Sequence, residues 1–458
     1  MIKNILLSLV LMVATASAYA EASGKISYMS GALVAQRPDG TVKVMGPKAE
    51  VFEGDLLVTA KDSYAQVVMN DGAKMTMRPN SNLKIESYKF KQNEPQADAA
   101  VFRLLKGGFR TVTGLIGKRG DKDAYKLRAS GATIGIRGTD FTSRLCATKD
   151  CADDADAKLA KPAAPQVKAV GRVMLIQGEL VAKDKDAKAR KLTLGSPVHE
   201  GDVLQSSVQS HAVVAFRDGS RITLQENSVF HIESFSYDKK TNQENAALRL
   251  IKGGVRVVTG LIGRVNHDNY KFRMSGATIG IRGTGFDAWC NGPCASGAAD
   301  FGATSGKPLD GAGVFVWAGE VVLVAPGGSF TVAINQAAII ARETGKPVTI
   351  LVVPPSITDN TAPKPDSVPV DVDKLFEESQ SEGEPGLYVT VHDGQVILAK
   401  GDEKVDLGKG ESGFTNDHIL TRLAGTPGFM SGDNKLDNIE NSGDTKSGIN
   451  GGGCVVGQ

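Results

Sequence analysis

An arginine framed by glycines occurs twice in this sequence, each time within the ten-residue stretch SGATIGIRGT. The stretches cover residues 130–139 and 275–284, and they place Arg137 and Arg282 between an Ile-Gly-Ile run and Gly-Thr. A guanidinium can bind a carboxylate or a phosphate through its planar fork of donors. It can also hold backbone carbonyls at the corner of a sheet. The apolar neighbours favour this structural role, because a buried unpaired charge is costly.

A pair of cysteines follows each copy of this stretch. Cys146 and Cys151 come after the first copy, and Cys290 and Cys294 come after the second. In an exported protein such local pairs are expected to form disulfides that hold a loop. The alternative is a four-cysteine zinc site, which requires the two pairs to meet. Cys454 is left over, as a free thiol, an intermolecular link or an attachment point.

The sequence gives little support for catalysis. Its six histidines are scattered without metal-ligand spacing, and it has no nucleophile elbow, phosphate loop or dinucleotide fingerprint. The one candidate acid is Asp140, whose counterpart in the second copy is Gly285. An aspartate that follows a threonine in a turn is usually a local hydrogen-bond acceptor. We therefore expect no enzyme, no cofactor and no metal, with an active site at Asp140 as the lesser alternative.

The ten-residue stretch belongs to a much longer repeat, which is the main feature of the sequence. VFEGDLLVT at 51–59 returns as VHEGDVLQS at 198–206. RLLKGGFRTVTGLIGK at 103–118 returns as RLIKGGVRVVTGLIGR at 249–264. The sequence therefore predicts two copies of one domain.

Each copy has the pattern of short strands separated by tight turns. Apolar runs flank Asp71-Gly72 and Asp218-Gly219, a typical hairpin signal. The paired glycines at 107–108 and 253–254 indicate sharp corners, where a Cβ would be strained. We expect an all-β fold, in which each domain is either a solenoid-like β-roll or a sandwich.

These motifs together resemble the FecR domain family. The resemblance covers roughly 24–151 and 170–336, and its most specific part is a G-x-R-G-T-x-F run. Most members of the family are binding and signalling modules, so the resemblance implies a fold more strongly than a function. The run is carried by Gly135, Arg137, Gly138, Thr139 and Phe141 in the first copy, and by Gly280, Arg282, Gly283, Thr284 and Phe286 in the second.

The start of the chain has the pattern of a secretory signal peptide. Lys3 is followed by an apolar run at 5–13, and Ala18-Tyr19-Ala20 fits a cleavage site before Glu21. The run is too short to span a bilayer. We expect a periplasmic or secreted protein without a membrane span. The best-known relatives implied by the resemblance relay a signal to a cytoplasmic sigma factor, which a fully exported chain would not reach.

The expected domain plan contains one further alternative. The strand module at 386–422 repeats the order of the strands that close the second domain. It either returns to complete the first domain, so that the second is nested inside it, or forms an independent hairpin. The segments are a signal peptide (1–20), domain 1 (24–151), a linker (152–169), domain 2 (170–345), a proline-rich acidic linker (346–385), the strand module (386–422) and a disordered tail (423–458).

The composition restricts the partners. The formal net charge is only +2, with acids and bases mixed along the chain, so no nucleic-acid surface is expected. The expected function is a binding, scaffold or signalling module that contacts another protein of the cell envelope. A glycan or peptidoglycan binder is the alternative, with Trp289 and Trp317 as the aromatic side chains that would stack on sugars.

Overall fold

The computed structural model describes most of the chain. Its helices are few and short, and none of those in the described residues is long and apolar enough to cross a membrane. The predicted signal peptide, Arg282, Cys294 and Cys454 fall outside the described residues. The described residues are 21–119, 121, 123–148, 151, 168–238, 244–281, 283–291, 311–340, 347–350, 361–379, 383–431, 436 and 439.

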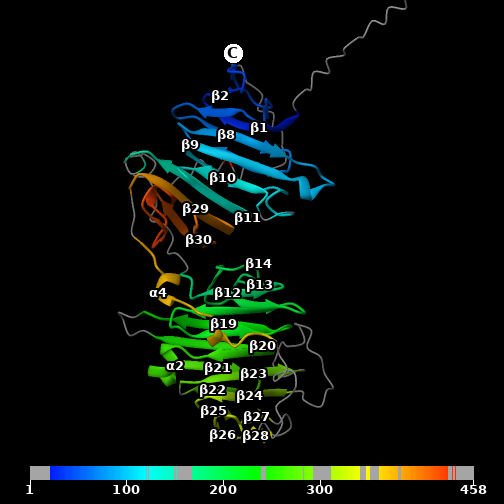
Figure 1. The fold of residues 1–458 in the computed structure, drawn as a ribbon, viewed down its shortest axis with the longest axis vertical. Coiled ribbons are helices and arrows are strands. Elements are labelled where there is room, and N and C mark those ends of the chain that lie inside the picture. The colour runs from blue at the N-terminus through cyan, green and yellow to red at the C-terminus, as the bar shows by residue number, and fades with distance from the viewer. Residues whose placement is uncertain are drawn as a thin grey trace, which may run out of the picture.

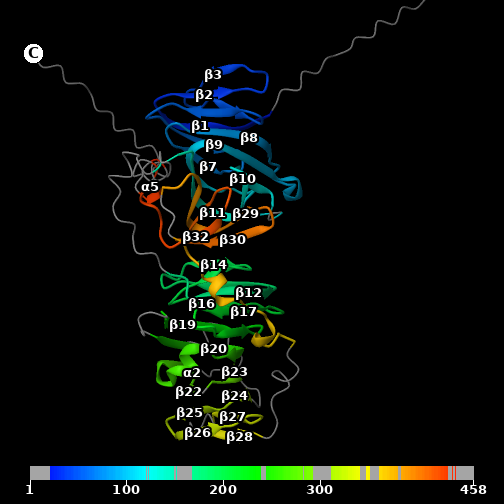
Figure 2. The same cartoon turned by 60° about the vertical axis from the view of Figure 1, so that its left-hand side comes forward.

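The first domain is built from two ladders of strands with an apolar core between them. Figures 1 and 2 show the strands stacked like rungs along the long axis of the molecule. The first ladder runs β3 (Val42–Val44), β2 (Leu33–Gln36), β5 (Leu56–Thr59), β8 (Asn82–Lys89), β9 (Ala99–Val112), β10 (Tyr125–Ala129), β11 (Ala132–Cys146), β29 (Gly386–Lys400) and β30 (Glu403–Gly408). The second runs β4 (Glu50–Phe52), β1 (Ala22–Ser30), β6 (Tyr64–Met69), β7 (Lys74–Met77), β9, β11, β29, β31 (Ser412–Thr415) and β32 (Leu420–Leu423).

The second domain repeats this arrangement strand for strand. Its first ladder runs β14 (Ala189–Leu192), β13 (Leu180–Lys183), β16 (Val203–Ser206), β19 (Val229–Ser236), β20 (Asn245–Val258), β21 (Tyr270–Met274), β22 (Ala277–Ile281), β25 (Val321–Ala325) and β26 (Gly328–Val332). Its second runs β15 (Pro197–Val198), β12 (Gly171–Gln177), β17 (His211–Phe216), β18 (Arg221–Leu224), β20, β23 (Gly285–Asn291), β24 (Gly311–Ala318), β27 (Ala337–Ile340) and β28 (Pro347–Ile350).

Long strands that belong to both ladders make each domain a flattened roll, and the paired glycines are where they turn. Gly107 in β9 and Gly253 in β20 have φ of 75° and 81°, and a Cβ at Gly107 would lie 2.4 Å from Ser81 Oγ. Ser81 Oγ accepts a hydrogen bond from Gly108 N at 2.9 Å and donates one to Gly108 O at 2.8 Å. Ser228 makes the same two bonds in the second domain. The corner is therefore satisfied by one serine in each copy.

The strand module at the end of the sequence lies in the first domain. β29 pairs with β11 from Thr133↔Ala399 to Cys146↔Gly386, and its Leu387 is fully buried in the core of domain 1. The whole of domain 2 is thus inserted between β11 and β29. This is the topology that the nested alternative requires, and no independent hairpin forms at 386–422.

Two expected boundaries need correction. The closing strands of domain 2 extend beyond 345, because β28 (Pro347–Ile350) pairs with β27. The segment after 422 does not begin as a disordered tail, since α5 (Gly428–Ser431) contacts domain 1. Phe429 in α5 lies with its ring centre 5.0 Å from that of Tyr388, and its carbonyl accepts a hydrogen bond from Arg144 Nη1 at 3.1 Å.

The proline-rich segment between β28 and β29 lies along domain 2 as a strap, which we define as residues 361–379. Arg256 Nη1 donates to Ala362 O at 2.6 Å, and Thr223 Oγ1 donates to Pro363 O at 2.9 Å. The strap contains one helical turn, α4 (Val372–Leu375). The strap therefore carries the chain back to domain 1 along the side of domain 2.

Candidate functional site

The Gly-Thr of the repeated motif forms a structural corner in the first domain. Gly138 has a φ of 55°, and its backbone N–H donates to Gly117 O at 2.7 Å. Thr139 N donates to Thr113 Oγ1 at 2.8 Å, and Thr139 Oγ1 donates to Gln395 O at 2.9 Å. These bonds join the loop after β9, strand β11 and strand β29, so the corner links segments that are distant in sequence.

The second copy repeats the corner. Gly283 has a φ of 64°, and Thr284 N donates to Thr259 Oγ1 at 2.9 Å. The two motif phenylalanines, Phe141 and Phe286, are fully buried in the domain cores. The side chain of Arg137 and all of Arg282 lie outside the described part of the chain, so the role of the arginine stays a prediction.

Asp140 takes part in an ion pair. Arg110 on β9 donates from Nε to Asp140 Oδ1 at 2.9 Å and from Nη2 to Oδ2 at 2.7 Å. Both carboxylate oxygens are therefore occupied by a guanidinium on the neighbouring strand. A bidentate pair of this kind fixes geometry between strands, which is a simpler role for Asp140 than acid catalysis.

In the second domain a tryptophan occupies the place of this ion pair. Gly285 replaces Asp140, and a Cβ at Gly285 would lie 2.4 Å from the ring of Trp317. Trp317 Nε1 donates to Asp287 Oδ1 at 3.2 Å, and Arg256 Nε lies 3.7 Å from the same oxygen. Burial raises the pKa of Asp287 to about 6 in spite of these two neighbours.

We expect Asp287 to make domain 2 less stable as the pH rises. Its pKa in the folded protein is about 6, above the ordinary value of 3.8, so folding favours the protonated acid. The stability is then fully present below about pH 4 and is lost as the pH rises to about 6. Urea unfolding at several pH values should show this slope for the wild type. Asp287→Asn should flatten it, and an unchanged slope would contradict the assignment.

The tryptophans do not form an exposed pair, which corrects the glycan-facing interpretation. Trp289 is only 1% exposed and packs over Gly313, where a Cβ would lie 2.1 Å from its ring. Trp317 is half-buried, with Lys364 Nζ of the strap 4.9 Å from its ring centre. A sugar cannot stack on Trp289 in this structure, so the observation that would favour a glycan site is missing.

The first cysteine pair forms a disulfide. Cys146 and Cys151 are bonded and buried, with a Cα–Cα distance of 5.6 Å, beside Tyr388 and Phe414. Cys290 is also disulfide-bonded and fully buried, while the expected partner Cys294 lies outside the described residues. A four-cysteine zinc site needs four free thiolates, so the Cys146–Cys151 bond rules it out in this state.

Two hollows lie at related positions of the two domains. One, of about 590 Å³, is a cleft between the domains, and the other, of about 550 Å³, is a groove on domain 2. Three lining positions correspond in the repeat. They are Arg119, Asp121 and Ile136 in the interdomain cleft and Val265, His267 and Ile281 in the groove.

The interdomain cleft is lined on one side by residues of domain 2. Residues 189–193, Ser196 and Pro197 line it together with Gly138 of domain 1. Ser196 Oγ donates to Gln395 Oε1 at 3.0 Å, and Lys188 Nζ lies 2.9 Å from Asp393 Oδ1. This hollow is thus part of the contact between domain 1 and domain 2.

A buried ion pair supports the same contact. Arg172 on β12 is 1% exposed, and its guanidinium binds the carboxylate of Glu411 and donates to Gly195 O at 3.1 Å. The sequence did not indicate this pair, because Glu411 comes from the returning strand module. The one signal was the change from Lys25 to Arg172 at equivalent positions of the repeat.

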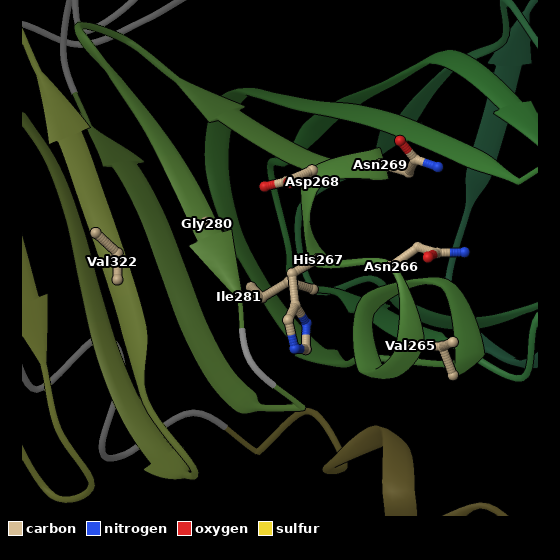
Figure 3. A pocket seen from close by; sticks show the side chains of 8 residues that line it. All are labelled: Val265, Asn266, His267, Asp268, Asn269, Gly280, Ile281 and Val322. Atoms are coloured by element: carbon tan, nitrogen blue, oxygen red, sulfur yellow. The ribbon is translucent and has the colours of Figure 1, made fainter.

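Among the described residues, those lining the groove on domain 2 all belong to domain 2. Figure 3 shows it between the segment 265–269 and the strands that carry Ile281 and Val322. Val265 is 68% exposed, and His267 Nδ1 donates to Gly263 O at 2.7 Å, which orients the ring. A Cβ at Gly280 would have its nearest neighbour at 3.6 Å, so no nearby atom requires a glycine at this point of the groove wall.

Comparison with known proteins matches the two repeats to one family. The model described as "FecR protein" matches residues 55–161 and 202–299. The search of curated proteins finds no match.

Three solved structures are similar over parts of the chain. A "Cell surface anchoring domain" is 21% identical, covers 14% of this chain and 82% of its own, and has a TM-score of 0.13. One structure of a "putative anti-sigma factor" from Parabacteroides distasonis ATCC 8503 is 14% identical, with a TM-score of 0.24. The match covers 34% of this chain and 62% of that one. Another, from the same organism, is 13% identical and covers 49% of this chain and 99% of its own, with a TM-score of 0.24. Similarities this low carry no functional argument.

Proposed function

We propose, because this chain carries two FecR domains, that it is a non-enzymatic binding and signalling module of the cell envelope. In this proposal the N-terminal signal directs export, and the protein acts by contact with another polypeptide. The Cys146–Cys151 disulfide supports an oxidising compartment. The bidentate Arg110–Asp140 pair supports a structural role for the one candidate acid.

One observation carries the proposal. The same part of the repeated fold faces residues of the other domain in domain 1, whereas in domain 2 it is lined by described residues of domain 2 alone. The groove combines exposed apolar surface at Val265 with amide and carboxylate groups of Asn266, Asp268 and Asn269. An apolar patch with polar groups around it is the arrangement of a protein-binding surface. We therefore place the partner contact on the groove of domain 2.

The test is crosslinking in cells from the groove. A photo-reactive amino acid at Val265 should capture one envelope protein, to be identified by mass spectrometry. The same amino acid at Val208, which is 66% exposed elsewhere on domain 2, serves as the control. Equal capture from both positions, or none from Val265, would count against the groove.

A filled groove should lose its partner without loss of folding. Gly280→Val places a branched side chain on the wall, where strand geometry accepts it. We expect capture from Val265 to fall about tenfold or more, the equivalent of about 1.4 kcal/mol. Gly135→Val makes the same change on β11, where the nearest atom to a Cβ is 4.0 Å away, and should leave capture unchanged.

A further inference from the structure

The contact between the two domains is head-to-tail. The end of domain 1 formed by β30 and the turn 408–411 meets the beginning of domain 2 formed by β14 and β15. Figures 1 and 2 show β30 and β14 facing each other at the middle of the stack. Two different faces of one repeated fold are therefore complementary. Contacts of this kind can continue from molecule to molecule, because they leave one face of each sort free.

Both faces have counterparts at the two ends of the stack, where no other described domain adjoins them. The segment 42–50, with edge strand β3, is equivalent to 189–197 of domain 2. The turn 333–336 of domain 2 is equivalent to 408–411. In the latter pair, Asn335 N donates to Val316 O at 2.7 Å, as Gly410 N donates to Val391 O at 2.8 Å. The backbone of the contact surface is thus repeated at each end.

The side chains at these two ends are more apolar than those at the internal contact between the domains. Lys191 and Lys409 line the interdomain cleft from opposite domains. Their counterparts at the two ends of the stack are Val44, which is 75% exposed, and Ile334, which is 53% exposed. Two lysines, of which Lys191 is paired with Glu179 at 3.0 Å, are therefore replaced by two aliphatic side chains that gain from leaving water.

We propose that a second copy of this chain stacks on the first, with Val44 of one copy against Ile334 of the other. This inference rests on the proposed function, since it names the polypeptide that covers this end of domain 2. The internal Arg172–Glu411 pair is not repeated, because Lys25 and Gln336 stand at the equivalent positions. The contact between copies is therefore weaker than the contact between domains, and it is reversible and linear.

Sedimentation velocity of the purified mature protein tests the stacking. We expect the weight-average mass to rise with concentration, from the monomer to at least twice its mass. Val44→Lys and Ile334→Lys, which copy the internal residues, should each remain monomeric. Val208→Lys should associate like the wild type. A wild type that stays monomeric at the highest soluble concentration would overturn the inference, as would association that both end variants retain.

Crosslinking between two variants tests whether the contact between copies is head-to-tail. In a background with Cys454→Ser, Val44→Cys and Ile334→Cys should form a disulfide dimer only when the two proteins are mixed. Dimers of either variant alone would show an isologous contact and overturn the head-to-tail geometry. These outcomes can be distinguished from a failure of the proposed function. Capture of a different envelope protein at Val265, with a monomeric purified chain, would support the function and reject the second copy.

Discussion

A chain that ends after Ser379 should keep a folded second domain and lose the first, although it contains the whole of the first repeat. The loss follows from the nested topology, since β29 pairs with β11 from Thr133 to Cys146, with an irregularity only between Arg137 and Phe141. The removed strands also contribute six buried core side chains: Leu387, Val389, Val391, Val396, Leu398 and Leu407. Each such side chain is worth about 1.5–3 kcal/mol when fully buried. Their loss is comparable to the whole stability of a domain, about 5–15 kcal/mol.

Amide hydrogen exchange resolved by segment would measure this result. We expect segments of domain 1 to exchange as unfolded chain, while β17 to β25 stay protected, because the strap up to Ser379 remains on domain 2. A matched protein that joins residues 21–151 directly to 384–431 should fold, since Cys146 and Gly386 are neighbours across the β11–β29 pair. Protection of domain 1 in the truncated chain would refute the nested arrangement.

The parts of the fold that were predictable from sequence are those that repeat. Duplicated motifs predicted two equal domains, and the Asp-Gly hairpins and paired glycines predicted where strands turn, because those turns depend on local chemistry. The return of β29 was predicted as an alternative only because its strand order copies that of β24 to β26. Local patterns can therefore indicate a long-range pairing when the chain contains a second example of it.

The site was less predictable, because it depends on neighbours across the fold. Trp289 seemed available for stacking, yet it is buried because Gly313 on the adjacent strand leaves room for its ring. Asp140 seemed a candidate acid until Arg110 was found beside it. The groove on domain 2 differs from the interdomain cleft because residues 189–193, 196 and 197 of the other domain line the cleft, and no described residue outside domain 2 lines the groove. No local pattern contains that information.

Without the Arg172 guanidinium, the two domains should no longer unfold together. Arg172→Met leaves the carboxylate of Glu411, whose side chain is 13% exposed, with the Gly408 N–H but without its guanidinium partner at the domain contact. Breaking a buried pair from one side costs about 3–5 kcal/mol. We expect the two domains to unfold in urea as one transition in the wild type and as two in the variant. Lys25→Met, at the equivalent and exposed position of domain 1, should leave the transition unchanged.

A double variant distinguishes the cost of the orphaned charge from the value of the contact. Arg172→Met with Glu411→Leu removes both charges, and replacement of a buried pair by apolar side chains is often neutral. We therefore expect the single transition to return. If the double variant unfolds in two steps like Arg172→Met, the ion pair itself holds the domains together. If Arg172→Met already behaves as the wild type, the contact depends instead on Ser196, Gln395 and the strap. In each case the nested connection keeps the domains adjacent, so these variants test the coupling between the domains and not their proximity.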